Sequence, residues 1–187
     1  QKFDYGYDEI VAEYVGRPDN IEIYNRNLEL LSEYYGGAQI MFENDRGEVL
    51  SYFKRRGKLS LLADQPDNVI SKVIQKSTVS RIKGCHMNDK MKDAGEKFIL
   101  RWLWTERGQR EDGSKIYNMD LIPSSGLLEE LIQYHRLGNF DRVMAFMQLM
   151  FSIEERYDAE ILEQPVNNQS ADYLITNISK MFGRKRR

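Results

Sequence analysis

Apolar residues recur every three or four positions in several parts of the chain, which predicts helices there. The four longest such stretches are residues 23–35, 48–56, 88–106 and 140–156, and two shorter ones are residues 69–74 and 127–134. Asp19 or Asn20 is suited to cap the first helix, and Gly36 with Gly37 is suited to end it. The last long stretch is apolar over most of its surface, so we expect that helix to be heavily buried.

Short apolar runs lie between the helical stretches and predict strands. Residues 38–43 and 59–63 form two such runs, and residues 2–15 indicate a hairpin. From residue 9 to residue 63 the predicted order is strand, helix, strand, helix, strand. Strands joined by helices of this length are usually parallel neighbours, so the pattern favours an α/β fold. Residues 107–115 read as a polar loop or a hairpin tip, with an extended segment after them.

Glu43 is the first candidate for chemistry. The apolar run from Ile40 stops at this acid, turn-forming residues follow it, and the next helix begins at Glu48. Open α/β sheets bind their ligands at the carboxyl ends of strands, where this acid is expected. The simpler interpretation, which this stretch alone favours, is that Glu43 ends a strand and faces water.

Composition limits the class of protein without identifying it. The length of 187 residues suits one main domain, which we place at residues 1–158, with a linker and a basic tail at 159–187. No run approaches the roughly 18 apolar residues needed to span a membrane. The single cysteine, Cys85, excludes an internal disulfide. With a net charge of −2, nucleic-acid binding would have to rest on local basic patches.

Asp141 is a second isolated acid, in the first turn of the apolar late helix. The helix N-terminus by itself would favour an acid there. If Asp141 and Glu43 converge at one sheet edge, their carboxylates would suit Mg²⁺ or Mn²⁺. Two such ions can stabilise both the attacking and the leaving oxygen when a phosphodiester is cut.

Other residues are weaker candidates. Glu130 and His135 precede Asp141 closely enough to support such a site, although a surface acid and a structural histidine are the simpler interpretations. Cys85 and His86 are adjacent rather than spaced as a zinc pair, and no second pair exists. A basic group follows Glu43 and would either guide a DNA backbone or form a solvated helix face: Arg46, Lys54, Arg55, Arg56 and Lys58.

Several pieces of sequence, in order, are similar to one family. They are residues 10–19 (IVAEYVGRPD), 35–47 with Phe-Glu-Asn, 84–87 (GCHM) with Lys92, 127–131 (LLEEL) and 138–145 (GNFDRVMA). Over roughly residues 9–152 the chain resembles the C-terminal nuclease domain of the large terminase subunit, the DNA-packaging motor of tailed bacteriophages and their prophages.

This resemblance implies an RNase H-like fold, a mixed sheet flanked by helices, with metal-dependent endonuclease activity on double-stranded DNA. Of the three metal-binding acids of the family, the second corresponds to Glu43 and the third to Asp141. Many relatives carry a further acid where this chain has Phe140. The family's portal protein, small terminase subunit and ATPase domain are implied partners, in the cytoplasm of an infected or lysogenic bacterial host and without a membrane.

The first acid of the family lies on a strand upstream of residue 9, and neither Asp4 nor Asp8 matches its position. We therefore expect a C-terminal piece of a longer protein that lacks the usual first strand. The prediction is an endonuclease domain that cuts concatemeric DNA with two Mg²⁺ or Mn²⁺ ions bound by Glu43 and Asp141. The alternative is a catalytically silent fragment that binds DNA or the portal. No Gly-x-x-x-x-Gly-Lys motif is present, so ATP hydrolysis is not expected of this chain.

Overall fold

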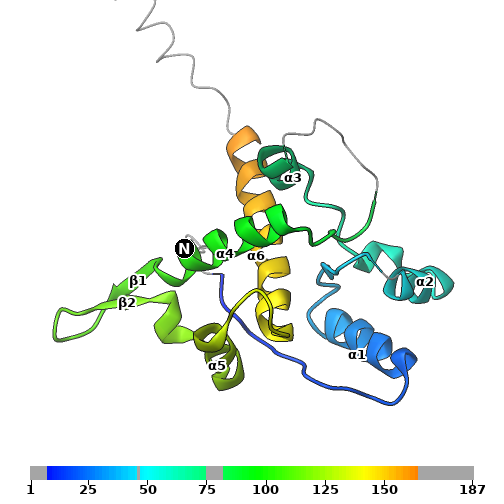
Figure 1. Ribbon diagram of the computed structural model, residues 1–187, viewed down its shortest axis with the longest axis horizontal. Coiled ribbons are helices and arrows are strands. Elements are labelled where there is room, and N and C mark those ends of the chain that lie inside the picture. Colours follow the sequence, from blue (N-terminus) through cyan, green and yellow to red (C-terminus); the bar gives the residue numbers. More distant parts are fainter. Residues whose placement is uncertain (1–7, 46, 75–81, 164–187) are drawn as a thin grey trace, which may run out of the picture. The chain divides into compact units, whose positions relative to one another are not determined.

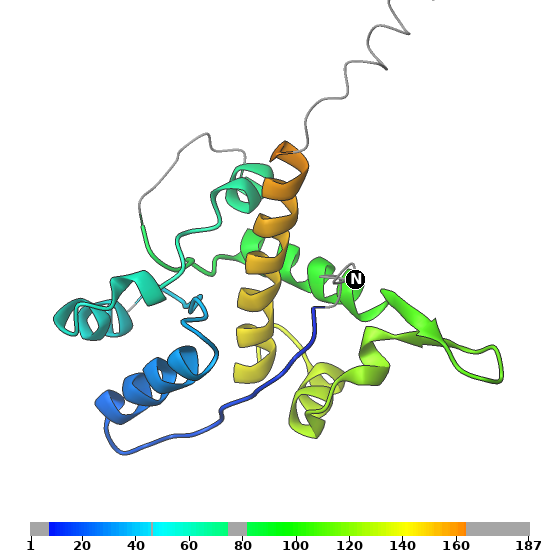
Figure 2. The same ribbon diagram turned by 180° about the vertical axis from the view of Figure 1, so that it is seen from behind.

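The computed structural model describes residues 8–45, 47–74 and 82–163, with side chains as far as residue 158 (Figures 1 and 2). Its architecture is mixed α/β, with six helices and one small antiparallel sheet in this part of the chain. The helices are α1 (Ile21–Tyr34), α2 (Glu48–Arg55), α3 (Asp67–Ile74), α4 (Asp89–Leu103), α5 (Ser125–Gln133) and α6 (Asp141–Glu163). The strands are β1 (Glu106–Gln109) and β2 (Lys115–Tyr117), and short 3₁₀ helices occupy Leu59–Leu61 and Asn118–Leu121.

The capping residues expected from the sequence are confirmed. Asn20 accepts a hydrogen bond from Glu22 N at 2.8 Å, and Asn88 accepts one from Met91 N at 3.1 Å. Side-chain acceptors of this kind satisfy the first free N–H groups of a helix. Gly36 has φ of 73°, a conformation that a glycine adopts without strain and that ends α1.

Two predicted strands are wrong. Residues 8–18 contain no strand, and two of their apolar side chains, Val11 and Val15, are 70% and 60% exposed. Residues 1–7, the rest of the predicted hairpin, lie outside the described residues, as does the basic tail. Leu59–Leu61 forms a 3₁₀ turn, and only Leu62 continues in an extended conformation. An apolar run alone does not make a strand, because a strand also needs a hydrogen-bonding partner along its length.

The segment around Glu43 nevertheless has the parallel pairing that the sequence predicts. Ile40 forms a parallel bridge with Leu62, and Glu43 forms another with Cys85. Asp64 and Lys83 form an antiparallel bridge that joins the two partner segments to each other. Each contact is an isolated bridge and not a full ladder. These three segments therefore bring Glu43 beside residues that follow it by about forty positions.

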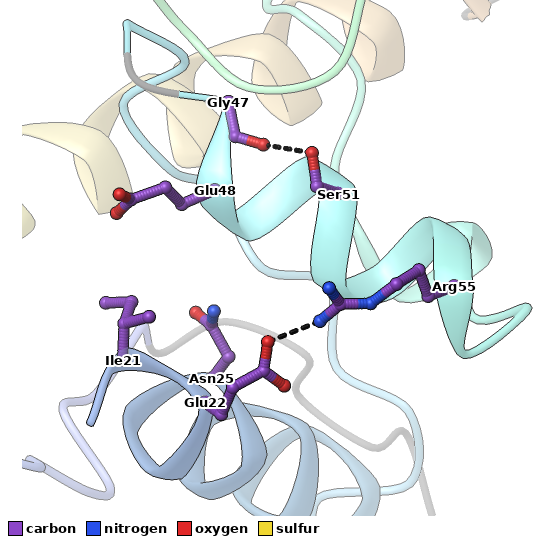
Figure 3. Close-up of a pocket in the computed structure, with 7 residues that line it drawn as sticks. All are labelled: Ile21, Glu22, Asn25, Gly47, Glu48, Ser51 and Arg55. Carbon is purple, nitrogen blue, oxygen red and sulfur yellow. Dashed lines mark hydrogen bonds and ion pairs between the residues drawn. The ribbon is translucent and has the colours of Figure 1, made fainter.

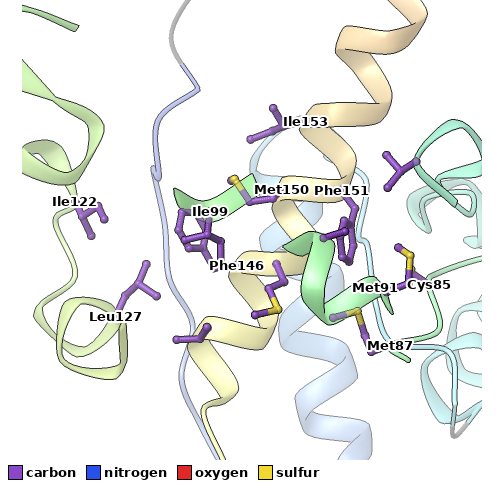
Figure 4. Close-up of a cluster of buried hydrophobic side chains, with 14 residues drawn as sticks. Cys85, Met87, Met91, Ile99, Ile122, Leu127, Phe146, Met150, Phe151 and Ile153 are labelled. Atoms are coloured by element: carbon purple, nitrogen blue, oxygen red, sulfur yellow. The ribbon is translucent and has the colours of Figure 1, made fainter. Parts of the chain in front are cut away.

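The main hydrophobic core lies where α4 and α6 cross (Figure 4). Gly95 of α4 makes a close approach possible, since a Cβ atom on this residue would lie 2.8 Å from Met147 Cγ. The core is contributed mainly by α6, whose buried apolar residues are Val143, Phe146, Met147, Met150, Phe151 and Ile153. Burial of these side chains is the main favourable contribution to folding, at roughly 1.5–3 kcal/mol for each large one.

A smaller cluster of buried apolar side chains lies around α2. Phe53 and Leu62 are completely buried there, and Phe42 and Tyr52 nearly so. α3 is instead attached to the main core by Glu155 of α6, whose carboxylate accepts hydrogen bonds from Asn68 N and Val69 N at 3.1 Å. A carboxylate at that position satisfies the N–H groups at the start of a helix and complements its dipole.

The polar loop predicted near residues 107–115 is a hairpin tip. β1 and β2 pair in antiparallel register with Gln109 opposite Lys115, and Gly113 has φ of 82° in the turn. Asp112 fixes the same turn by accepting a hydrogen bond from Ser114 N at 2.9 Å.

The described elements as far as Glu155 belong to one compact unit, and the last turns of α6, from Arg156, belong to a second unit. None of the helices in the described residues is both long enough and apolar enough to cross a membrane.

Candidate functional site

Glu43 lies at the end of the extended segment, as the sequence predicts. Backbone hydrogen bonds fix it from both sides, since Cys85 N donates to Phe42 O at 2.8 Å and Asn44 N donates to Cys85 O at 3.2 Å. Gly84 passes so close to this segment that a Cβ atom there would lie 2.6 Å from Phe42 O, and its φ of 77° also favours glycine. The backbone around Glu43 is therefore tightly positioned.

Acidic and basic side chains surround the Glu43 carboxylate. Loss of hydration raises the pKa of Glu43, and a hydrogen bond to Asp45 and its negative charge raise it further. The positive charges of Lys92 and His86 act in the opposite direction. Asp45 also contacts His86 Nδ1. Glu43 thus belongs to a group with Asp45, His86 and Lys92.

Three members of this group were not identified by sequence reasoning. Asp45 is one of the turn-forming residues after Glu43, Lys92 entered only through the family resemblance, and His86 entered only through that resemblance and as part of an unsuitable zinc pair. The short separation of Glu43 and Asp45 was a usable signal, but the approach of His86 depends on the bridge to Cys85. Cys85 itself is not suited to chemistry, because burial raises the pKa of its thiol to about 12 and keeps it protonated.

Asp141 is the first residue of α6, as predicted. Its carboxylate is 75% exposed and lies 3.9 Å from the Arg17 guanidinium. Tyr24 of α1 lies close enough to Asp141 to be affected by its charge. Burial first, and then the charges of Tyr14 and Asp141, raise the pKa of the Tyr24 phenol. No hydrogen bond or ion pair joins Asp141 to Glu43 within the described residues. In this part of the chain, no group of three or more His, Cys, Asp or Glu side chains has the arrangement of a metal site.

Glu130 holds the start of α6 immediately after Asp141. Its carboxylate accepts from Arg142 N at 2.9 Å and from Val143 N at 3.3 Å, and it pairs with Arg142 Nη1 at 2.7 Å. Arg142 Nε also donates to Glu13 at 2.7 Å. Gly126 leaves room for this guanidinium, since a Cβ there would lie 2.9 Å from Arg142 Cζ. Glu130 therefore fixes the helix turn that carries Asp141.

We expect Glu130→Ala to lower the free energy of unfolding by about 1–2 kcal/mol, because two helix N–H groups and Arg142 lose their acceptor. Urea unfolding measures this change. The matched control is Glu129→Ala, at the neighbouring exposed position of α5, which should change stability by less than about 0.5 kcal/mol. Equal effects of the two substitutions would contradict the capping role of Glu130.

His135 is exposed, and its ring contacts the Phe140 ring edge-on with centroids 5.2 Å apart. This contact places the imidazole beside the residue that precedes Asp141. The arrangement agrees with the simpler interpretation from the sequence, in which His135 is a structural histidine. A supporting role of His135 in the site stays a prediction.

The basic group after Glu43 is mostly engaged in ion pairs with α1. Arg55 pairs with Glu22, and Arg56 pairs with Glu29 at 3.0 Å. Lys58 pairs with both Glu29 and Glu33. Lys54 is exposed and forms no ion pair among the described residues, and Arg46 lies outside them. Three of the four described basic side chains therefore hold α1 against α2, which reduces the positive charge available to a DNA phosphate.

Glu29 is the centre of these contacts. Its side chain is only 3% exposed, and Tyr52 Oη donates to it at 2.6 Å. The hydrogen bond from Arg56 is the largest of several interactions that lower the pKa of Glu29 to about 2. Sequence reasoning assigned these basic residues by their proximity to Glu43 in the chain and did not identify Glu29 as their partner.

Comparison of the chain with protein-family models, with curated proteins and with solved structures found no match. The geometry of the site therefore carries the functional argument, together with the resemblance in the sequence.

Proposed function

We propose that this chain is an RNase H-like, metal-dependent endodeoxyribonuclease domain of the phage terminase class. The observation that carries the proposal is the position of Glu43, a carboxylate at the end of a parallel-bridged segment and one turn before helix α2 begins at Glu48. The pairing of Ile40 with Leu62 supports the α/β order, and the start of α6 at Asp141 supports the role proposed for Asp141.

The residues around Glu43 fit a divalent cation in part. Glu43 and Asp45 present adjacent carboxylates, and the like charge that raises the pKa of Glu43 is a charge that a cation would relieve. A bound Mg²⁺ or Mn²⁺ would supply an activated water and stabilise the leaving oxygen. Glu43 and Asp141 are the proposed ligands.

The chain's own side chains would then position the DNA. Lys92 lies close enough to affect the charge of Glu43, and a lysine there can hold a phosphate beside the acid. Lys54 is exposed and is the member of the basic group that forms no ion pair among the described residues, so it is the best placed of them to contact a more distant phosphate. Double-stranded DNA is the proposed substrate, and the portal protein, small subunit and ATPase domain remain proposed partners.

Nicking of supercoiled plasmid tests this proposal. The folded chain is incubated with Mn²⁺, Mg²⁺ or EDTA, and Asp141→Asn is compared with the unchanged chain. We expect nicking that requires Mn²⁺ or Mg²⁺ and is lost in EDTA and in Asp141→Asn. A folded chain that retards DNA in a gel but nicks none of it under any condition would contradict the nuclease and support the alternative, a silent binding module.

A further inference from the structure

A pocket of about 280 Å³ lies between the first turns of α1 and α2, apart from the Glu43 group (Figure 3). Ile21, Glu22 and Asn25 line it from α1, and Glu48, Ser51 and Arg55 line it from α2. Two helices thus contribute polar side chains to one concave surface. A pocket of this volume can accommodate a small polar group.

Asn25 is the side chain in this pocket that most clearly lacks a partner. The residue is 2% exposed, and its carbonyl oxygen has no hydrogen-bond donor in the described part of the chain. Figure 3 shows its carboxamide directed from α1 toward α2 and into the pocket. Buried polar groups in native proteins are nearly always paired, so an unpaired one indicates a missing partner. That partner must be able to donate a hydrogen bond.

The charges of the pocket define the partner further. Glu22 is neutralised by its ion pair with Arg55, and Ser51 Oγ donates to Gly47 O at 2.8 Å. The Glu48 carboxylate has no ion pair or hydrogen bond among the described residues. Among the described residues that line the pocket, two carboxylates and one guanidinium leave one uncompensated negative charge. An anionic ligand would therefore be repelled, and a ligand with a single positive charge would neutralise the pocket.

We propose that this pocket binds a guanidinium group. Such a group carries one positive charge and several N–H donors in one plane, so it can pair with the Glu48 carboxylate and donate to the Asn25 carbonyl at the same time. The source would be either a free guanidinium compound or an arginine side chain of another protein. The proposal is independent of the nuclease function, because neither Glu43 nor Asp141 takes part.

NMR titration of the ¹⁵N-labelled chain tests the proposal, since the side-chain NH₂ signals of Asn25 report directly on the pocket. The probes are methylguanidinium, N-acetylarginine methylamide and the neutral isostere methylurea. We expect saturable shifts of the Asn25 signals with a cationic probe and none with methylurea at the same concentration. Binding of methylguanidinium would support a free compound as the source, and binding of the arginine derivative alone would support a protein side chain.

Two variants separate the pocket from general electrostatic attraction. Glu48→Gln should weaken binding at least about tenfold, a change of about 1.4 kcal/mol, while the matched Glu111→Gln, at the exposed hairpin tip, should leave it unchanged. Asn25→Leu should abolish binding, and because this variant lacks the Asn25 side-chain signals, its binding is read from the backbone amide signals of Glu48 and Ser51. Because Glu48 is exposed, its variant is expected to fold even if Asn25→Leu does not. The proposal is overturned if neither cationic probe shifts the Asn25 signals, if methylurea or inorganic phosphate binds as well, or if Glu48→Gln has no effect.

Discussion

Replacing Glu43 by glutamine is expected to lower Mn²⁺-dependent nicking of plasmid at least about 100-fold, or about 2.7 kcal/mol in transition-state stabilisation. Glutamine keeps the size of the side chain but removes the negative charge that a divalent ion needs. Folding should not suffer, because partial loss of hydration and then Asp45 raise the pKa of Glu43, and its ionised form is therefore disfavoured in the folded state. The substitution is thus predicted to lower the nicking activity without lowering the stability of the fold.

Initial nicking rates and urea unfolding at pH 7 measure these two changes. Glu111→Gln, an exposed acid at the hairpin tip, controls for a general change in charge. A Glu43→Gln variant that is as active as the unchanged chain would remove Glu43 from the catalytic group. A variant that loses activity and stability together would indicate a structural role instead.

Replacing Glu29 by glutamine should lower the free energy of unfolding at pH 7 by about 2 kcal/mol. Moving the pKa from its ordinary value of 4.5 to about 2 corresponds to at most about 3.4 kcal/mol. We reduce this figure because the side chains of Arg56 and Lys58 are 54% and 32% exposed and water screens them. The loss is nevertheless large for one substitution, since Glu29 itself is buried.

The effect of Glu29 should depend on pH with a definite sign. Its pKa is lowered in the folded state, so its contribution is present above pH 4.5 and is lost as the pH falls toward 2. Urea unfolding at pH 7 and pH 3 should therefore show a smaller difference between the unchanged chain and Glu29→Gln at the lower pH. Glu33→Gln is the control, because Glu33 contacts only Lys58 of this group and is 44% exposed. A difference that is equal at both pH values would contradict the ionic role of Glu29.

Helices could be predicted from this sequence with useful accuracy, whereas two of the strands expected from apolar runs do not form. Asn20, Asn88 and Ser124 act as local signals, since each caps its helix through a hydrogen bond that lies within three residues in the chain. A strand depends on a distant partner. Residues 8–18 have the apolar pattern of a strand, but no strand of the described chain pairs with them, so they remain irregular.

The candidate site also has features that the sequence predicts and features that depend on tertiary contacts. The pattern of apolar and turn residues was enough to locate Glu43 at the end of an extended segment and Asp141 at the start of a helix. The neighbours of Glu43 depend on the bridge to Cys85, which brings His86 next to Asp45 across 41 positions of sequence. Likewise, the ion pairs of Arg56 and Lys58 with Glu29 depend on the packing of α2 against α1.

The sequence by itself therefore determined the helices, their caps and the positions of the two isolated acids, because these features depend on interactions between near neighbours. Only the tertiary structure decided which charges meet. It placed Asp45 and Lys92 beside Glu43, joined the basic group to α1 and left the Asn25 carboxamide facing a pocket. Such contacts form between segments that are distant in the chain, and their geometry is fixed by packing of the whole unit rather than by local preference.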